Sequence, residues 1–248
     1  MNKQIMSIAE VSRYLGFSQR KVYQLVKDEK IPVSKIGGQY RFIKDEIDSW
    51  LRNSKPIAGK SNNIALINRI KSIQDINKRR LYLIGLLTKK LEPEKVRPII
   101  VGGCALEFYT TGGYNTADID IICPSSELLD SILSKWGFKK EGRHWISNEL
   151  DMYIESPGSV LKGADPSKVT RVRIEDVDVY LIGIEDLIID RLNATVHWHS
   201  SDDRYWVKEL IYIHRNRIDM DYLRKRAGEE KTAQEFDNIL KEIPHENI

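Results

Sequence analysis

The sequence IIVGGCAL at residues 99–106, followed by TADIDII at residues 116–122, decides the fold of this chain. Each segment contains a run of β-branched apolar residues, which is typical of a buried strand, and the stretch between them is compatible with a short helix. Gly102 and Gly103 end the first run, and two aspartates separated by one residue open the second. This order predicts a strand, a tight turn, a helix and a second strand, with functional groups at the turn and on the second strand.

The two aspartates, Asp118 and Asp120, are candidate metal ligands. Side chains alternate along a strand, so both point to the same face, about 6.6 Å apart at a rise of about 3.3 Å per residue. Two carboxylates on one face repel each other unless a cation or a proton lies between them, and hard divalent cations prefer oxygen ligands of this kind. The pair therefore predicts a site for Mg2+ (or Mn2+).

The Gly-Gly turn predicts a phosphate site beside these aspartates. Glycine lets the backbone approach a phosphate closely, and a helix beginning near Cys104 offers free N–H groups to an anion. We take Gly102, Gly103 and Thr116 as candidate nucleotide-binding residues. A phosphate site next to a metal site is the arrangement that phosphoryl or nucleotidyl transfer needs; the alternative is a plain tight turn followed by a chance D-x-D.

Gly102-Gly103 followed by Asp118-x-Asp120 resembles the motif of the polymerase-beta-type nucleotidyltransferase superfamily. The likeness is greatest to the small bacterial and archaeal members found near mobile elements and in toxin–antitoxin or abortive-infection systems. It implies a third carboxylate on a later strand, and the acidic segment ELDMYIE at residues 149–155 supplies candidates. Alternation favours Asp151, with Glu149 as the second choice.

The resemblance implies transfer of NMP from an NTP to a protein, RNA or small-molecule acceptor. Asp118 and Asp120 would bind two Mg2+ ions, and Asp151 would hold one of them and help to deprotonate the acceptor hydroxyl. These three are the candidate catalytic and metal-binding residues. The alternative is a transcriptional regulator or excisionase-like architectural protein whose catalytically inactive domain senses a nucleotide.

The chain departs from the superfamily pattern at two positions. Many members have Ser at the place of Gly103, and relatives often carry an Arg at the place of Tyr114. Because that Arg would bind the triphosphate, Lys139, Lys140 or Arg143 would have to replace it.

Basic charge is concentrated at the N-terminus. Residues 1–55 contain 11 Lys and Arg against 6 Asp and Glu, whereas the remaining residues contain 28 against 30. A small basic segment ahead of a nearly neutral body indicates that the segment binds nucleic acid.

The basic segment has the pattern of a winged helix-turn-helix. Ser7 can cap a first helix, Gly16-Phe17-Ser18 forms a turn, and a second helix is expected from Gln19 to about Glu29. Gly37-Gly38 predicts a hairpin, and a third helix follows through Leu51. The segment closely resembles the excisionase and MerR-like winged-helix family, which implies that it binds double-stranded DNA.

The exposed residues of the second helix and hairpin are the candidate DNA contacts. The alternative is that they are solvated charges on a protein-interaction domain. The candidates are Gln19, Arg20, Tyr23 and Gln24 for the major groove, and Lys21, Lys27, Lys35 and Arg41 for the backbone or minor groove.

These patterns predict an α+β protein in four parts: a winged helix-turn-helix at 1–53, a linker at 54–63, a nucleotidyltransferase-like α/β domain at 64–183 and a helical extension at 184–248. One long helix from Ile64 to about Leu91 would pack on a mixed sheet of five or six strands or form a homodimer seam. Asp186, Arg191 and Lys208 could border the cleft.

Composition predicts an ordinary globular protein. Apolar residues make up 41% of the chain, and no apolar run approaches the roughly 20 residues that span a bilayer. We therefore expect a cytoplasmic protein without membrane contact, in which Cys104 and Cys123 are buried thiols.

Overall fold

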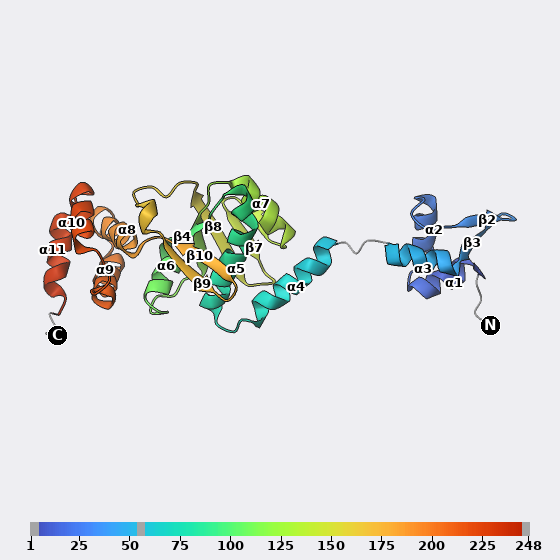
Figure 1. Cartoon of the computed structure of the whole chain (residues 1–248), viewed down its shortest axis with the longest axis horizontal. Coiled ribbons are helices and arrows are strands. Elements are labelled where there is room, and N and C mark those ends of the chain that lie inside the picture. The colour runs from blue at the N-terminus through green and yellow to red at the C-terminus, as the bar shows by residue number, and fades with distance from the viewer. Residues whose placement is uncertain (1–4, 54–57, 245–248) are drawn as a thin grey trace. The chain divides into compact units, whose positions relative to one another are not determined.

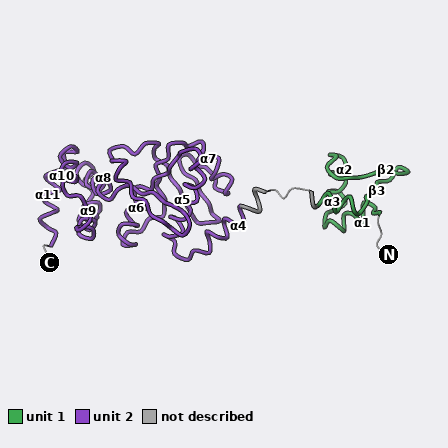
Figure 2. Tube along the Cα trace, in the orientation of Figure 1, with its two compact units in different colours: residues 1–62 green, residues 63–248 purple. Residues whose placement is uncertain are grey.

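The computed structural model describes residues 5–53 and 58–244 and is shown in Figure 1. The chain divides into two compact units, Met1–Asn62 and Asn63–Ile248, which Figure 2 colours separately. Residues 54–57 of the predicted linker lie outside the described residues, and residues 58–63 belong to the first turns of a helix.

The helices of the first unit are built by local capping. Ser7 accepts a hydrogen bond from the Glu10 N–H while the Glu10 carboxylate accepts one from the Ser7 N–H, a reciprocal capping box. Gly16 ends the helix in the left-handed conformation, and Ser18 caps the next one. The helices of this unit are α1 (Ile8–Leu15), α2 (Gln19–Lys27) and α3 (Lys44–Asn53).

A three-stranded antiparallel sheet completes the first unit. Its strands, in the order β1-β3-β2, are β1 (Ile5–Met6), β2 (Ser34–Ile36) and β3 (Gln39–Ile43). Gly37 and Gly38 both have positive φ, as the tight turn between β2 and β3 requires. Val11, Val22, Phe42 and Ile47 are fully buried between the helices and the sheet. The predicted second helix ends at Lys27, two residues early, because Glu29 adopts a positive φ.

A mixed seven-stranded sheet forms the centre of the second unit. Its order is β6-β7-β8-β5-β4-β10-β9, in which β5 runs parallel to β8 and β4 runs parallel to β10. The prediction of five or six strands was therefore too low. The strands are β4 (Ile99–Ile100), β5 (Asp118–Ile122), β6 (Lys139–Glu141), β7 (His144–Ser147), β8 (Met152–Gly158), β9 (Thr170–Ile174) and β10 (Val177–Leu181).

The predicted long helix is two helices, α4 (Ala58–Ser72) and α5 (Ile76–Leu91). The break occurs because the Asp75 side chain accepts a hydrogen bond from the Lys78 N–H and so starts a new helix. Helix α5 packs on β10 and has a largely buried face. A short 3-10 helix, Glu92–Glu94, follows it.

Further helices cover the sheet and extend beyond it. Helix α6 packs on β5, and α7 lies against β6 and α5. In Figure 1 the last four helices gather at the C-terminal end of this unit. The helices are α6 (Gly102–Tyr109), α7 (Ser126–Lys135), a 3-10 turn at Pro166–Lys168, α8 (Ile184–His197), α9 (Ser201–His214), α10 (Met220–Glu229) and α11 (Ala233–Glu242).

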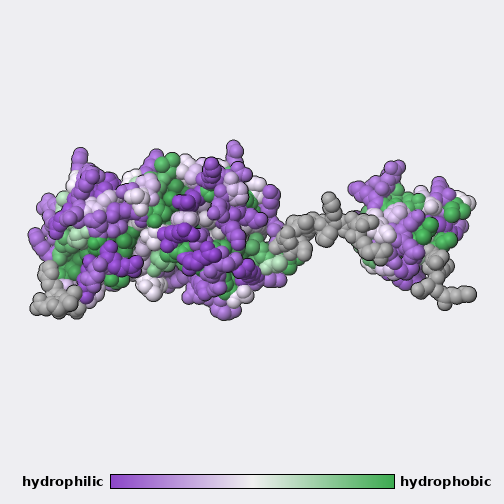
Figure 3. All heavy atoms as spheres, viewed as in Figure 1, coloured by the Kyte–Doolittle hydropathy of each residue, from purple (hydrophilic) through white to green (hydrophobic). Residues whose placement is uncertain are grey.

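The surface of each unit is mainly hydrophilic on the face seen in Figure 3, with small hydrophobic areas between the polar side chains. Among the described residues, no helix combines the length and the apolar composition needed to cross a membrane. Cys104 and Cys123 are free and buried, as predicted.

The close packing of α5 on β10 depends on Gly85. A Cβ atom at this position would lie 2.9 Å from Val177 Cβ and closer still to one of its methyl groups.

We expect Gly85→Ala to lower the free energy of unfolding by about 1–3 kcal/mol through overpacking, measured by urea denaturation. Gly228 in α10 is the matched control, because a Cβ atom there meets nothing within 4 Å. Gly228→Ala should be neutral or stabilise by up to about 1 kcal/mol; equal stability of both variants would contradict this account.

Candidate functional site

The carboxylates of Asp120 and Glu155 lie on neighbouring parallel strands in direct register. The pairing of β5 with β8 places Asp118 opposite Tyr153 and Asp120 opposite Glu155. Side chains that are opposite each other project from the same face of the sheet, about 5 Å apart. Asp118 is exposed and Asp120 is half-buried, while Ile119 between them is fully buried in the core. The structure thus brings three carboxylates, on Asp118, Asp120 and Glu155, to one face.

Asp151, the favoured third carboxylate, does not lie beside Asp120. It is exposed, has a φ of +53° and occupies the turn before β8, which begins at Met152. Glu149, the second choice, is exposed ahead of that turn and forms an ion pair with Lys71 at 3.1 Å. Asp151 precedes the first residue of β8, so the alternation of side chains along that strand does not apply to it. Glu155 is the acidic residue of β8 that pairs with Asp120.

Gly102 and Gly103 begin α6 directly against Asp120. Gly102 has a φ of +58°, and a Cβ atom on it would lie 3.0 Å from Asp120 Cγ, so a larger side chain would be strained and would also collide. The Gly103 N–H donates to Asp120 Oδ2 at 3.3 Å. Thr116 Oγ1 accepts a hydrogen bond from the Asp118 N–H and contacts the position that a Cβ on Gly103 would occupy. All the predicted nucleotide-binding residues therefore adjoin the two aspartates.

The environment of Asp120 disfavours its ionised form. Burial raises the pKa of this carboxyl above the ordinary value of 3.8, and the nearby carboxylates of Glu155 and Asp118 raise it further. The Gly103 hydrogen bond and the positive charge of Arg191 act in the opposite direction. A cation placed among the three carboxylates would favour the ionised form of Asp120 and so lower the pKa that burial and like charge raise.

Arg143 and His144 engage Glu155. Arg143 Nε lies 2.8 Å from one carboxylate oxygen of Glu155, and His144 Nδ1 lies 3.6 Å from the other. Both residues belong to the hairpin formed by β6 and β7. Of the predicted phosphate-binding cations, Arg143 is therefore at the site, whereas Lys140 forms an ion pair with Asp130 and Lys139 lies exposed on the edge strand β6.

A pocket of about 470 Å3 opens beside the Gly102 turn. Gly102 and Asp120 form part of its wall, and Ser159 and Lys162 come from the loop after β8. Lys162 is exposed and is a cation that the sequence analysis missed. No local pattern marks it, because it reaches the pocket through a loop that lies 60 residues after Gly102.

Arg191 links the helical extension to this site. Its guanidinium bonds Asp190 at 2.6 Å and Asp203 of α9 at 3.0 Å, and Asp190 lines the pocket. The other two residues expected to border the cleft lie elsewhere. Asp186 is buried and accepts hydrogen bonds from Tyr222 and the Asp165 N–H, and Lys208 pairs with Glu242.

The donor chemistry of the three carboxylates fits a hard divalent cation, since all are oxygen ligands on one face of the sheet. Within residues 5–53 and 58–244, however, no group of three His, Cys, Asp or Glu side chains is assembled closely enough to hold a metal ion. Glu155 is instead paired with Arg143. A complete ligand set therefore requires Glu155 to exchange this partner for the cation.

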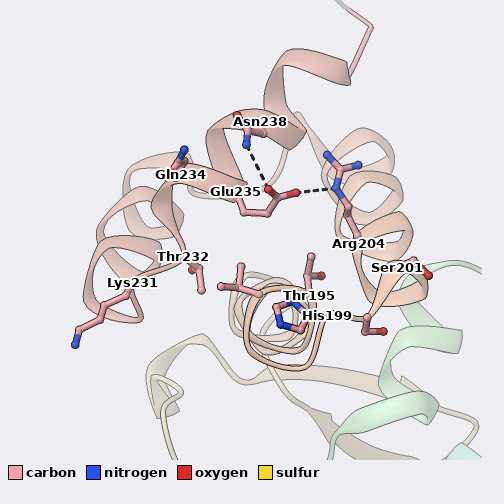
Figure 4. Close-up of a pocket in the computed structure, with 11 residues that line it drawn as sticks. Thr195, His199, Ser201, Arg204, Lys231, Thr232, Gln234, Glu235 and Asn238 are labelled. Carbon is pink, nitrogen blue, oxygen red and sulfur yellow. Dashed lines mark hydrogen bonds and ion pairs between the residues drawn. The ribbon is translucent and has the colours of Figure 1, made fainter.

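A second pocket, of about 560 Å3, lies between α8, α9 and α11 (Figure 4). Arg204 in its wall bonds Glu235 at 2.7 Å and also pairs with Glu242. Lys231 points away from the cavity in Figure 4. Because its arginine is already neutralised by two carboxylates, this pocket is a poor phosphate site, and it shares no residue with the pocket beside Gly102.

The first unit presents the predicted DNA contacts on its surface. The candidate DNA contacts on α2 are all exposed, and Gln24 bonds Asp28, the C-terminal cap of this helix, at 2.7 Å. Tyr23 packs edge-to-face on Tyr40 of β3 with ring centroids 6.3 Å apart, so the second helix and the hairpin contact each other. Lys35 lies 5.7 Å from the Tyr40 ring. The exposed α2 residues are Gln19, Arg20, Lys21, Tyr23, Gln24 and Lys27.

The fold and the site define a nucleotidyltransferase-like domain behind a helix-turn-helix domain. The model of a helix-turn-helix domain family matches residues 5–55. The model of the family described as "Nucleotidyltransferase of unknown function (DUF6036)" matches residues 80–242, and the chain belongs to that family. The α+β fold class and both predicted resemblances are confirmed.

Solved structures with a similar fold include an antigenic nucleotidyltransferase-like protein from Paracoccidioides brasiliensis, at 15% identity and a TM-score of 0.45, covering 65% of this chain and 92% of that one. The antibiotic-resistance factor ANT(2'')-Ia in solution gives 14% identity, a TM-score of 0.43 and coverages of 64% and 94%. The crystal structure of ANT(2'')-Ia in complex with adenylyl-2''-tobramycin has 14% identity and a TM-score of 0.42, and the match covers 61% of this chain and 97% of that one. The search of curated proteins gave no match.

The raised pKa of Asp120 predicts how its replacement changes stability. A raised pKa in the folded state means that the stabilising contribution is present below pH 3.8 and is lost as the pH rises through the higher folded value. Without divalent cations, Asp120→Asn should therefore increase the free energy of unfolding at pH 7, and the gain should shrink as the pH falls through the raised folded pKa and be largely lost at about pH 4. Urea denaturation in EDTA at both pH values measures this.

Asp118→Asn is the matched control for this experiment, because Asp118 is exposed and its replacement should change stability less. A loss of stability at pH 7 in the Asp120 variant would show that its hydrogen bond to Gly103 outweighs the cost of burial.

Proposed function

We propose that the second unit is a Mg2+-dependent nucleotidyltransferase that moves NMP from an NTP to a protein, RNA or small-molecule acceptor. The observation that carries the proposal is the register of β5 and β8, which sets Asp120 beside Glu155 and against the Gly102 turn. Membership of a nucleotidyltransferase family supports it. The family description leaves the acceptor open.

In the proposed reaction the triphosphate lies at the start of α6. Val101, at the N-terminal cap of α6, provides no side-chain hydrogen bond, so N–H groups of its first turn remain for an anion. Lys162, in the pocket wall, and Arg143, beside Glu155, are our candidates for a cationic contact with the β- and γ-phosphates. They would replace the arginine that relatives carry at the position of Tyr114.

The chemical step joins the acceptor hydroxyl oxygen to the α-phosphorus. The bond from the α-phosphorus to the oxygen that bridges to the β-phosphate breaks, and pyrophosphate leaves with that bonding electron pair. The hydroxyl proton passes to a carboxylate, for which Glu155 is the proposed base. Asp118, Asp120 and Glu155 would hold Mg2+, which would neutralise developing charge on the transferred phosphate.

A second candidate function is a regulator whose nucleotidyltransferase-like domain senses a nucleotide without turnover. The ion pair between Glu155 and Arg143 favours it, because a permanent pair would leave only two carboxylates for a cation. In either case the first unit would bind double-stranded DNA in the cytoplasm, as a monomer or homodimer, in a mobile-element or toxin–antitoxin setting.

Transfer of label distinguishes the two functions. The purified chain is incubated with each α-32P-labelled NTP, Mg2+ or Mn2+, and total RNA or cell extract. Labelled acceptor is expected from the wild type and should be lost, by at least a hundredfold, in the Asp118→Ala/Asp120→Ala variant. Failure of the wild type to label anything under all these conditions would favour the regulator.

The same assay decides which residue is the third carboxylate. Glu155→Gln should reduce labelling about as strongly as the aspartate variants, whereas Asp151→Asn should stay within about twofold of the wild type. A large loss of labelling in Asp151→Asn together with a small loss in Glu155→Gln would instead identify Asp151 as the third carboxylate, as the sequence predicted. The two substitutions are matched, because each removes one charge from the same β8 region and keeps the shape of the side chain.

DNA binding by α2 is testable through its salt dependence. Lys21→Ala/Lys27→Ala, which removes two of the predicted backbone contacts, should weaken binding of a random-sequence 30-base-pair duplex and reduce the slope of log K against log salt by about two, since each phosphate contact contributes roughly 0.9. Fluorescence anisotropy from about 50 to 200 mM salt measures the slope. Arg13→Ala, an exposed arginine on α1, is the control and should leave it unchanged. An unchanged slope in the double variant would place the DNA elsewhere.

A further inference from the structure

A row of three aromatic side chains runs from the phosphate-binding turn to the surface. A Cβ on Gly103 would lie 3.2 Å from a ring carbon of Tyr114, so this ring lies directly against the turn. Tyr114 packs at 90° on Trp206 of α9, with ring centroids 5.4 Å apart. Trp206 packs in turn on Tyr205, with centroids 4.9 Å apart and an angle of 80°. The row connects the predicted triphosphate site with α9.

Exposure increases along the row. Tyr114 and Trp206 are half-buried and pack against the hydrophobic core, whereas 53% of Tyr205 is exposed. Edge-to-face pairs of this kind hold each ring in a fixed orientation. A large exposed aromatic ring on a rigid base, two rings away from a phosphate-binding turn, is suited to stacking a planar ligand.

The position of α9 ties this row to the carboxylates. Asp203 lies three residues before Trp206, so both occupy the same side of α9. Asp203 holds Arg191 at 3.0 Å, and the charge of Arg191 acts on Asp120. Helix α9 therefore carries both Trp206 of the aromatic row and the Asp203 partner of Arg191, while the Tyr114 ring brings the row against the Gly103 turn.

We propose that Tyr205, supported by Trp206 and Tyr114, stacks the base of the nucleoside triphosphate whose phosphates lie at Gly102 and Gly103. This inference rests on the proposed function, since it extends the same nucleotide site. Every base has a π face, and stacking alone distinguishes bases poorly. The site should therefore bind purine and pyrimidine triphosphates with similar affinity.

Calorimetric titration of the full chain with Mg-ATP, Mg-UTP and inorganic triphosphate tests the platform. Tyr205→Ala should weaken binding of both nucleotides about tenfold and leave the binding of triphosphate, which has no base, unchanged. Tyr205→Phe keeps the ring and should bind all three probes within about twofold of the wild type. Ile213→Ala is the matched control, since Ile213 is 47% exposed on the same helix and lies outside the aromatic row.

The outcomes separate the two proposals. If the wild type binds ATP and triphosphate and Tyr205→Ala binds ATP equally well, the base platform is overturned and the phosphate site stands. If the wild type binds neither ATP nor triphosphate, both proposals are overturned. A loss of triphosphate binding in Tyr205→Ala would also overturn the platform, because it would reveal a general disturbance of the site. Circular dichroism of each variant verifies that it is folded.

Discussion

The burial of the Asp120 carboxylate beneath the Gly102 turn is the constraint on which the candidate site depends. Parallel pairing of β5 with β8 sets Asp120 beside Glu155, and the Gly102 turn closes over Asp120 so tightly that only glycine fits. Burial and like charge together raise the Asp120 pKa. The fold thus keeps an electrostatic cost that a hydrophobic side chain at 120 would not have, and a bound cation is the simplest way to offset it.

Features that are local in the sequence could be predicted, because the chemistry of a few neighbouring residues fixes them. The Ser7 cap and the Gly37-Gly38 hairpin require only adjacent residues, and so does the turn at Gly102. Asp151 was expected on the strand, but its positive φ puts it in the turn and the strand begins at Met152. Alternation predicts the face of a side chain only when the first residue of the strand is known. The pairing register that selects Glu155 belongs to tertiary structure.

Groups that come from distant segments could not be predicted in the same way. Lys162 reaches the pocket from a loop, Asp190 reaches it from a helix of the C-terminal extension, and the charge of the adjacent Arg191 acts on Asp120. The break at Asp75 was missed for a related reason: apolar periodicity continues on both sides, and one capping hydrogen bond divides the helix. Local pattern thus finds the aspartates and the glycine turn of the candidate site, whereas the cationic and aromatic residues around them are brought there by packing.

Arg143 determines which of the two functions the carboxylates serve. Its guanidinium at 2.8 Å neutralises Glu155 in the same way that a divalent cation would, so the two compete for one carboxylate. Arg143 lies on the hairpin at the edge of the sheet with 66% of its side chain exposed, whereas Glu155 is 15% exposed, so solvent screens the pair from the side of the arginine only. In the proposed reaction, a divalent cation shared by three carboxylates would take the place of Arg143 on Glu155, and the released guanidinium would be free to contact the triphosphate. Whether Glu155 exchanges its partner is therefore the physical difference between the proposed nucleotidyltransferase and a domain that only senses a nucleotide.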